Sequence, residues 1–563
     1  MRARTTRRVS LTRWEMNIRM ESTRPTSARS ARGRLIAAAS LATAAFAVLA
    51  LPGLASAGSF SSKAMRASQI RKLSRQAPKR DTLSPAARRI QRRGYLVPNE
   101  AAYQRQKARA DRRAAARHAL TQPAAPFGPR APSTIRAFAG INDTFFAPPD
   151  ETSAVGTGRY IQLVNADFAI YNKTGNTPIS TGTLNSMVGA GSNDFVFDPQ
   201  IIWDPTTNRF YYAADDEVSP TNHVLLWGWS KTATPTSAAD WCKYGINSGS
   251  TLADFPKLGD SQHFGIIGTN LFNSVGSFVG SNILAFKKPP SGTSCPSPQE
   301  ANKAIPTSAF TPTPANEIDT NGTGWVVARG RPTPATKLFL FKVTRNASGN
   351  PVINTTPTSV TVPSYNVPAN APQQGSVNRI DTSDARNTQA VAANDPGHSG
   401  KFALWTQHTV SGGAGAEVRW YELDVANHSV IQKGKATNTS LFEFNGAIAP
   451  NRRVNGTTKS GGNAMVMNFN TSSSAAKPGI RMVSKIGGGA QSGQVAVKSS
   501  PGQLSGFDCD ATSHLCRWGD YAAVTPDPST ANQMWNVSQF AVGSGSGTGG
   551  GATSRTWHFV VQP

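Results

Sequence analysis

The sequence predicts an all-β protein, a β-propeller of five to seven four-stranded blades, preceded by a signal peptide and a basic segment that is partly helical or disordered. From about residue 137 the chain consists of short apolar runs separated by Gly, Asn, Thr, Ser and Pro, a pattern typical of strands and turns. No comparable stretch has helical periodicity. The strands recur in units of roughly 40–60 residues, as the blades of a propeller do.

Residues 1–57 are expected to be a signal peptide. Arginines precede an apolar run over residues 35–51, and Ala55–Ala57 supplies the small residues at which signal peptidase cleaves. The run is too short and too rich in Ala for a transmembrane helix, so we expect no membrane span in the mature form. The expectation is Sec export with cleavage after Ala57 and a secreted, extracellular protein. The start codon stays open between Met1, Met16 and Met20.

Residues 58–136 form a basic segment rich in Arg, Ala, Gln and Pro. Residues 1–136 contain 29 Lys and Arg against 5 Asp and Glu, whereas the propeller domain, residues 137–563, contains 29 against 27. The positive charge lies outside the folded body, which argues against nucleic-acid binding. Asn99 is placed to cap a helix over residues 100–120. Because this helix has almost no large apolar residues, we expect a solvated spacer or pro-segment; adhesion to an anionic cell-wall polymer is the alternative.

Four strands are predicted between residues 199 and 245, in the runs QIIWD, RFYYAAD, HVLLWGWS and WCKYGI. Trp227 and Trp229 share one face of their strand, and we expect them to pack in the core rather than to stack on a sugar. In the usual ring closure of a propeller the last strand pairs with the first blade. Residues 557–561 are therefore expected beside residues 160–171.

Four cysteines, an even number in a chain predicted to be exported, indicate two disulfides. Cys509 and Cys516 are close enough in sequence to close a small loop, which leaves Cys242 to pair with Cys295. The chain has no CxxC motif, and His514 has no second histidine beside it, so we expect no metal site at the cysteines.

The chain contains four characteristic stretches in this order: residues 148–175 (PPDETSAVGTGRYIQLVNADFAIYNKTG), IIWDPTTNRFYY, DFPKLGDSQHFGIIGTNLF and CRWGDYAAVTPDP. Together they resemble a group of secreted bacterial β-propellers that are distantly sialidase-like. That resemblance covers about residues 145–561 and implies no specific activity. A sialidase would need an arginine cluster, and the first blade lacks the F/Y-R-I-P stretch of that family; Arg159 is the nearest substitute.

The acidic candidates for catalysis begin with Asp215, Asp216 and Glu217, which directly follow a predicted strand. Clustered carboxylates can bind Ca²⁺ or act as a general acid–base pair. Successive side chains on an extended backbone diverge, so a solvated strand end is the favoured interpretation. Asp194, Asp198 and Asp204 are expected to form turns, because Asp198 and Asp204 precede proline.

Arginines are the candidates for binding an acidic ligand. Arg379 and Arg386 accompany Asp381 and Asp384 just before a strand; they could hold a carboxylate bidentately, but pairing with their own aspartates is favoured, and Asp381 is a weak catalytic candidate. A second pair, Arg329 and Arg331, has no acidic neighbour nearby in the sequence. These two are the arginines expected to have the fewest local partners.

The stretch CRWGDY contains the last candidates. Arg517, Asp520 and Tyr521 could contact a ligand or take part in catalysis, but their place near ring closure favours a structural pair between Arg517 and Asp520. Trp518 and Tyr521 are at odd spacing and are expected to face opposite sides.

The favoured function is a secreted, monomeric binding or scaffold protein that presents one face to a glycan or another cell-surface ligand, such as a cell-wall polymer. The histidines considered (His223, His263, His408, His514 and His558) are scattered singly, and no complete catalytic set is present. No cofactor is expected, apart from the Ca²⁺ that the acidic cluster could accept. The alternative is a sialidase-like glycoside hydrolase that uses an Arg/Asp cluster near the propeller axis.

Overall fold

The computed structural model describes residues 96–118, 131–141, 146–290, 295–455, 458–543 and 553–563. The expected signal peptide, residues 1–57, lies outside the described residues, as does much of the basic segment. No helix within the described ranges is long and apolar enough to cross a membrane.

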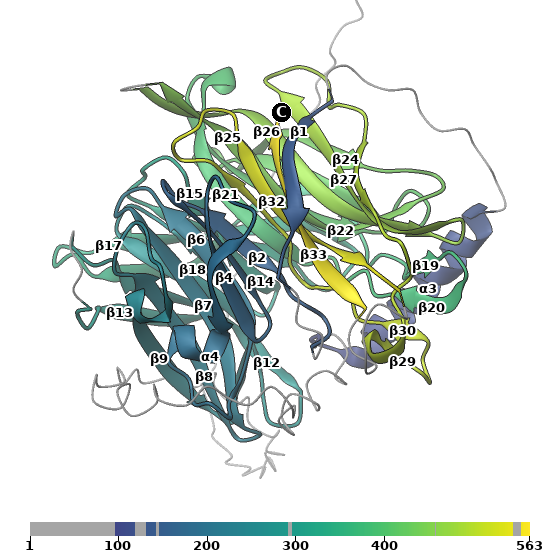
Figure 1. The fold of residues 1–563 in the computed structure, drawn as a ribbon, viewed down its shortest axis with the longest axis horizontal. Helices are drawn as coiled ribbons and strands as arrows, with labels where there is room; N and C mark the ends of the chain where they lie inside the picture. Colours follow the sequence, from purple (N-terminus) through teal and green to yellow (C-terminus); the bar gives the residue numbers. More distant parts are fainter. Residues whose placement is uncertain (1–95, 119–130, 142–145, 291–294, 456–457, 544–552) are drawn as a thin grey trace, which may run out of the picture. The chain divides into compact units, whose positions relative to one another are not determined.

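Seven sheets of the described chain are blades built mainly from antiparallel strands that follow one another in sequence (Figure 1). The first three blades are β2 (Thr152–Val155), β3 (Arg159–Val164), β4 (Asp167–Asn172) and β5 (Pro178–Thr183); β6 (Phe195–Asp204), β7 (Arg209–Ser219), β8 (Asn222–Ser230) and β9 (Trp241–Gly249); and β10 (Leu252–Asp260), β11 (Phe264–Phe272), β12 (Phe278–Lys287) and β13 (Glu300–Ile305). The short helix α4 (Leu184–Val188) connects the first two blades.

The fourth to seventh blades follow the same order. The fourth blade contains β14 (Ala309–Pro314), β16 (Gly324–Gly330), β17 (Ala335–Arg345) and β18 (Pro351–Tyr365), and the fifth contains β21 (Asn387–Asp395), β22 (Lys401–Val410), β23 (Glu417–Asp424) and β24 (Ser429–Ala436), with β15 (Asn316–Glu317) added parallel to β21. The sixth blade contains β25 (Phe442–Asn455), β26 (Thr458–Ser473), β27 (Ala476–Ile486) and β28 (Val495–Ser499). The seventh contains β31 (Ala523–Pro526), β32 (Met534–Ala541), β33 (Ser554–Gln562) and β1 (Ser133–Ala139).

The blades form a closed ring around an axis. Each innermost strand packs against the next blade, in the order β2, β6, β10, β14, β21, β25, β31 and back to β2. The predicted propeller is therefore confirmed, with seven blades in the described chain. Trp227 and Trp229 are fully buried with Tyr244 and Phe286 between the second and third blades, as expected for core residues.

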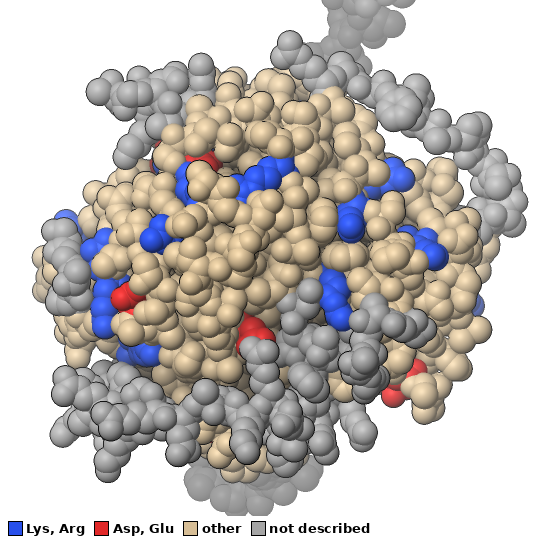
Figure 2. Space-filling model, viewed as in Figure 1, with Lys and Arg blue, Asp and Glu red and all other residues tan. Residues whose placement is uncertain are grey.

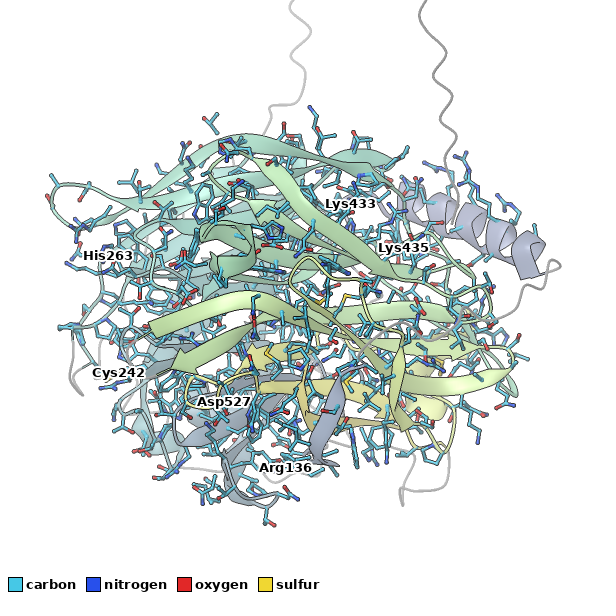
Figure 3. The ribbon with its side chains drawn as sticks, turned by 90° about the horizontal axis from the view of Figure 1, so that it is seen from above. Arg136, Cys242, His263, Lys433, Lys435 and Asp527 are labelled. Atoms are coloured by element: carbon cyan, nitrogen blue, oxygen red, sulfur yellow. A yellow bond between two sulfur atoms is a disulfide. The ribbon has the colours of Figure 1, made fainter. Side chains whose placement is uncertain are left out.

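The ring is closed by β1, not by the expected pairing of the last strand with the first blade. Strand β33 pairs antiparallel with β1, from Ser133 opposite Gln562 to Ala139 opposite Trp557 (Figure 1). Because β1 begins at Ser133, the propeller extends into the part of the chain assigned to the basic segment. Residues 557–561 still contact the first blade through side chains, since Tyr160 Oη lies 2.6 Å from His558 Nδ1. Arg136 of β1 (Figure 3) lies over the ring of Phe138, 4.9 Å from its centroid.

A small sheet outside the ring is built from β19 (Ala371–Gln373), β20 (Ser376–Ile380), β30 (Leu515–Cys516) and β29 (Cys509–Asp510). The predicted Cys509–Cys516 disulfide joins its two shortest strands, and the predicted Cys242–Cys295 disulfide (Cys242 in Figure 3) is also present. Both predictions are confirmed. Two disulfides are what a protein of an oxidising compartment carries.

The helix predicted from Asn99 is α3 (Glu100–His118), and Asn99 Oδ1 accepts a hydrogen bond from Ala102 N at 2.9 Å. It is not a solvated spacer. Tyr103, Lys107, Ala110 and Ala114, spaced along one face of the helix, are buried against the rest of the fold. Because two of these side chains are alanines, the helix approaches closely: a side chain at Gly415 would come within 2.9 Å of Ala114.

Four innermost strands share an irregularity near their beginning. In β6, β10, β14 and β25 two residues stand opposite one on the neighbouring strand. The first residue of each bulge has a positive φ: 53° at Asp198, 57° at Phe255, 56° at Thr311 and 48° at Asn445. A β-bulge turns a side chain away from the regular alternation of the strand. The repeated bulges therefore re-aim side chains at one end of the axis.

Candidate functional site

Side chains from five blades meet at the axial end where the innermost strands begin. We call this group the axial cluster; its members are Asp150, Asp198, Asp254, Phe255, Lys257, Arg386, Arg517, Asp520 and Tyr521. All are buried except Asp254 and Arg517, which are partly exposed. Three of the four sequence stretches that resemble secreted propellers supply seven of these nine residues, all except Asp198 and Arg386.

Tyr521 is at the centre of the axial cluster. Its hydroxyl donates to Asp198 Oδ2 at 2.9 Å, and its ring centroid lies 4.9 Å from that of Phe255 and 3.6 Å from Lys257 Nζ. Trp518 points elsewhere, because its Nε1 donates to Asn470 Oδ1 at 3.0 Å. The predicted opposite orientation of Trp518 and Tyr521 is confirmed.

Asp150 and Asp520 link the first and last blades. Asp520 N donates to Asp150 Oδ1 at 2.7 Å, and Asn165 Nδ2 donates to Asp150 Oδ2 at 2.7 Å. Arg517 binds the Asp520 carboxylate bidentately, at 2.9 and 3.2 Å. The favoured ion pair between Arg517 and Asp520 is therefore present, and it lies inside the axial cluster.

Burial changes the protonation of this cluster. Burial, with Asp254 and Asp520 nearby, raises the pKa of Asp198 to about 7. Burial also raises the pKa of Asp254 to about 7, although Arg386 opposes the change. The pKa of the Lys257 ammonium is lowered well below its usual value, again mainly by burial. Carboxyl groups that titrate near pH 7 can both donate and accept a proton under neutral conditions.

The arginines expected to have few partners are paired. Arg329 NH2 binds Asp384 Oδ2 at 3.1 Å, although 55 residues separate them, and Arg386 Nε binds Asp384 Oδ1 at 2.8 Å. Burial alone would raise the pKa of Asp384, but Arg386 and Arg329 hold it well below its usual range. The expectation that Arg329 lacks an acidic neighbour was wrong, because the propeller brings adjacent blades together. Arg331 is half-buried over the ring of Phe278, at 4.9 Å.

Asp215, Asp216 and Glu217 do not form a solvated strand end. They lie within β7 and are 1–3% exposed. Their side chains diverge, as expected for a strand: besides burial, Asp198 and Asp254 raise the pKa of Asp215, whereas Asp194 raises the pKa of Asp216. Burial raises the pKa of Asp216 to about 8. The interpretation of Asp198 as a turn residue was also incomplete, since its carboxylate accepts from Tyr521.

Asp381 and Arg379 hold helix α3. Asp381 Oδ1 lies 3.4 Å from Lys107 Nζ and accepts from Tyr103 Oη at 3.4 Å. Arg379 NH2 lies 3.8 Å from Asp111 Oδ1. Both residues were candidates for ligand contact or catalysis, and the structure gives them partners in the helix instead.

A narrow channel continues along the axis below the axial cluster. It is lined by residues of six innermost strands, among them Thr152, Gln200, Lys257, Thr313, Thr388 and Ala523. Most of these side chains are small or uncharged.

Two features of the site were missed by the sequence analysis. No local pattern marks Asp150, Asp254 or Lys257 as a site residue, although they lie in the stretches PPDETS and DFPKLGD. Asp395, His398 and Glu422 also lie together, with one ligand-type atom of each within 4.8 Å of the others. The signal for His398 is the sequence DPGH, an Asp-Pro turn that carries a histidine at the end of a strand.

On the face drawn in Figure 2, Lys and Arg side chains are scattered among uncharged residues and form no continuous patch. This agrees with the nearly balanced charge of residues 137–563.

No family model and no curated protein matches this chain. Among solved structures it is similar to the extracellular domains 1–2 of Drosophila Semaphorin 1b, with 7% identity, a TM-score of 0.36 and coverage of 77% of this chain and 87% of the other. It is also similar to a Dos1 propeller, with 9% identity, a TM-score of 0.35 and coverage of 77% of this chain and 95% of the other. For an exo-β-1,3-galactanase from Clostridium thermocellum the identity is 11% and the TM-score is 0.29. The match covers 73% of this chain and 95% of the other. The chain is a β-propeller, and its seven-bladed ring follows from its own sheet topology.

Proposed function

We propose that the axial cluster binds a neutral glycan and that the protein works as an exported binding protein through this end of the propeller. The observation that carries the proposal is the convergence of carboxyl, ammonium and aromatic side chains from five blades at one end of the axis. Ligand sites are typically concave places where a few polar groups converge among apolar ones.

The chemistry of the cluster suits hydroxyl groups. Asp150, Asp198 and Asp254 supply carboxyl oxygens, and Phe255 and Tyr521 supply aromatic faces beside them. Three arginines in or beside the axial cluster are bound by internal carboxylates, Arg517 by Asp520 and Arg329 and Arg386 by Asp384. An acidic sugar would have to compete with these carboxylates, so the proposal names a neutral glycan rather than a sialoside.

A glycan array tests the proposal with the intact chain and with Asp254→Asn, chosen because Asp254 is the partly exposed carboxyl of the cluster. Asp216→Asn is the matched control, since this buried carboxyl lies outside the cluster. We expect binding to neutral glycans that falls at least about tenfold in Asp254→Asn and is unchanged in Asp216→Asn. Equal binding by all three proteins would contradict the assignment of the site.

Glycoside hydrolysis is a second candidate function. It is favoured by the two carboxyls, Asp198 and Asp254, whose pKa values are raised to about 7, because a glycosidase needs one protonated and one ionised carboxyl. Fluorogenic glycosides, sialosides included, test it. Turnover that is abolished in Asp198→Asn and retained in Asp216→Asn would support hydrolysis, and no turnover by the intact chain would exclude it for those substrates.

A further inference from the structure

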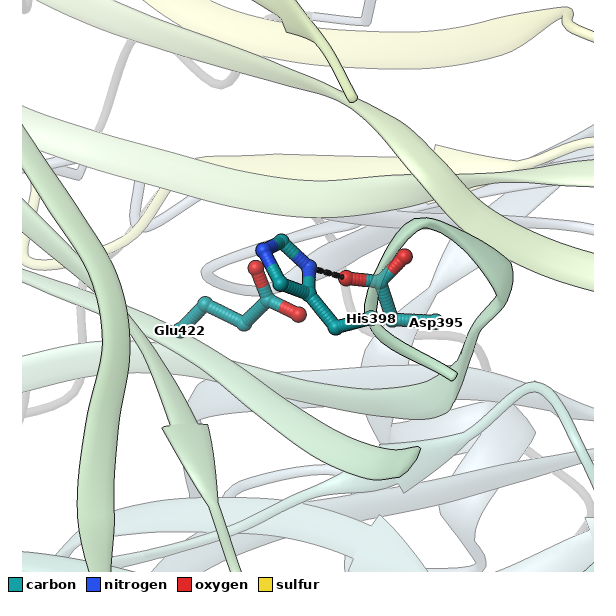
Figure 4. A group of neighbouring side chains, drawn as sticks. All are labelled: Asp395, His398 and Glu422. Carbon is teal, nitrogen blue, oxygen red and sulfur yellow. Dashed lines mark hydrogen bonds and ion pairs between the residues drawn. The ribbon is translucent and has the colours of Figure 1, made fainter. Parts of the chain in front are cut away.

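We propose that Asp395, His398 and Glu422 form a binding site for a divalent transition-metal ion of the Zn²⁺ type. Asp395 ends β21, His398 ends the 3₁₀ turn that follows (Pro396–His398), and Glu422 lies in β23 of the same blade. Figure 4 shows the imidazole of His398 lying between the two carboxylates. One donor atom of each residue lies within 4.8 Å of the other two.

The position of Glu422 is the independent indication of a ligand. Glu422 is fully buried, and Gln432 Nε2 donates to its Oε2 at 2.5 Å. Its other oxygen, Oε1, is buried and accepts no hydrogen bond from a donor of the described chain; the neighbouring group is the Asp395 carboxyl. Leaving a buried carboxylate oxygen without a donor is costly. Lys485, the neighbouring cation, donates to Gly487 O at 2.6 Å instead.

The surroundings hold the donor atoms in place. Gly397 N donates to Asp395 Oδ1 at 2.7 Å, and Asp395 Oδ2 also contacts His398 Nδ1. A bond such as that from Gly397 N orients a ligand of a metal site. His398 is about one-third exposed, with a relative side-chain exposure of 32%, so the group borders solvent.

The donor set selects the ion. One imidazole nitrogen and two carboxylate oxygens match the ligands of Zn²⁺, whereas Ca²⁺ takes six to eight oxygens. Zn²⁺ is expected to need three protein ligands and water at a tetrahedral site.

Calorimetric titration of the metal-free full chain with ZnCl₂ tests the site, and CoCl₂ serves as the spectroscopic probe. We expect one Zn²⁺ per chain, no competition by CaCl₂, and visible Co²⁺ absorption typical of four-coordinate geometry. His398→Ala and Glu422→Gln should each weaken binding at least about tenfold, and His263→Ala, a partly exposed histidine of the third blade (Figure 3), should not. Circular dichroism of the metal-free variants checks that they fold. Absence of Zn²⁺ binding, or binding that is equal in folded His398→Ala, would overturn the proposal.

A second inference concerns residues 96–118, which we call the strap. We infer that the strap covers the axial cluster and must move before a ligand can enter; this rests on the proposed function. Leu96 O accepts from Arg386 NH2 at 2.9 Å, and the Arg386 guanidinium lies over Phe255, 4.5 Å from its centroid. Leu96 also packs against Phe195 and Phe197 beside the axis.

The strap is held by apolar contacts, with Ala110 and Ala114 in a buried cluster, and by polar contacts as well. Lys107 Nζ donates to Thr382 Oγ1 at 3.0 Å and lies 3.4 Å from Asp381 Oδ1. Asn370 N donates to Asp111 Oδ1 at 2.9 Å. The opposite face of α3 exposes Arg105, Arg109, Arg112 and Arg113, which are cleavage sites for trypsin once the helix is released. Lys107 is a buried charge of the strap, so its reversal sets a carboxylate against Asp381 and weakens the docking of the helix.

The test compares the intact chain with Lys107→Glu, which places a carboxylate against Asp381, and with Arg105→Glu, the same charge change on the exposed face. In Lys107→Glu we expect faster tryptic cleavage within α3 and glycan binding at least about tenfold tighter; in Arg105→Glu, neither. Faster cleavage with unchanged glycan affinity would overturn the covering role and leave the proposed function standing. No glycan binding by the released variant would overturn the proposed function itself.

Discussion

Replacing Asp198 with asparagine should stabilise the protein at neutral pH and leave it unchanged near pH 4. The carboxyl of Asp198 is 7% exposed, and its pKa is raised from 3.8 to about 7. Asparagine keeps an oxygen that can accept from the Tyr521 hydroxyl. It cannot ionise, and its amide can donate to neighbouring carboxyl oxygens. The substitution therefore removes the titration and retains the geometry.

The size and sign follow from the two pKa values. Below about pH 4 the carboxyl is protonated in both the folded and the unfolded chain, so Asp198 adds no pH-dependent penalty. Between about pH 4 and 7 the unfolded chain has lost this proton and the folded chain still holds it, so the free energy of unfolding falls as the pH rises. A difference of about 3 pH units corresponds to at most about 4 kcal/mol at 1.36 kcal/mol per unit. Above about pH 7 the loss is complete.

Urea denaturation of the intact chain and Asp198→Asn between pH 4 and 8 measures this difference. We expect equal free energies of unfolding near pH 4 and a variant more stable by about 1–4 kcal/mol at pH 7.5. Asp384→Asn is the control of opposite sign, because two arginines lower the pKa of Asp384. Its loss of about 3–5 kcal/mol at neutral pH should begin to shrink only below about pH 4. Parallel pH profiles for the intact chain and Asp198→Asn would refute the reasoning.

Three further outcomes are expected from the fold. Arg517→Ala should lower the free energy of unfolding by about 3 kcal/mol, because it leaves the Asp520 carboxylate buried without its bidentate partner; unchanged melting temperatures would contradict a structural role for this pair. Removing the Cys242–Cys295 disulfide, with a sequence separation of 53, should lower the free energy of unfolding by about 4 kcal/mol. Removing Cys509–Cys516, with a separation of 7, should lower it by about 2–3 kcal/mol. Urea denaturation of the paired Cys→Ser variants measures both losses, and a larger loss for the Cys509–Cys516 pair would contradict chain entropy as the cause. Deleting residues 1–139 should expose the edge of β33 and promote association, measured as a larger mass by light scattering, whereas a stable monomer would show that β1 is dispensable.

The blades could be predicted because their information is local. Alternating apolar residues and turn signals between residues 199 and 245 define β6 to β9, and the even number of cysteines with one close pair gives both disulfides. The N-cap at Asn99 likewise predicts α3 from four consecutive residues. In each case the interacting groups are neighbours in sequence, or are selected by elimination from a very small set.

The axial cluster could not be predicted because its members come from five blades. The contact between Asp150 and Asp520 joins residues 370 positions apart, and the pair of Arg329 with Asp384 spans two blades. The bulge at Asp198 adds a second difficulty: a regular strand would not aim this carboxyl at Tyr521, and Asp-Pro equally suits an ordinary turn. The buried Asp215–Glu217 run shows the same limit, since burial of charged residues depends on what the neighbouring blade supplies.

The pairing of β1 with β33 fixes when this protein can finish folding. On the ribosome β1 is made more than four hundred residues before its partner, residues 554–562. Until that last strand has been translated, β32 keeps an unpaired edge and β1 has no sheet to join. Completion must therefore wait for the whole propeller domain to be synthesised, which is the order required by the predicted Sec export, where a chain crosses the membrane unfolded and folds afterwards.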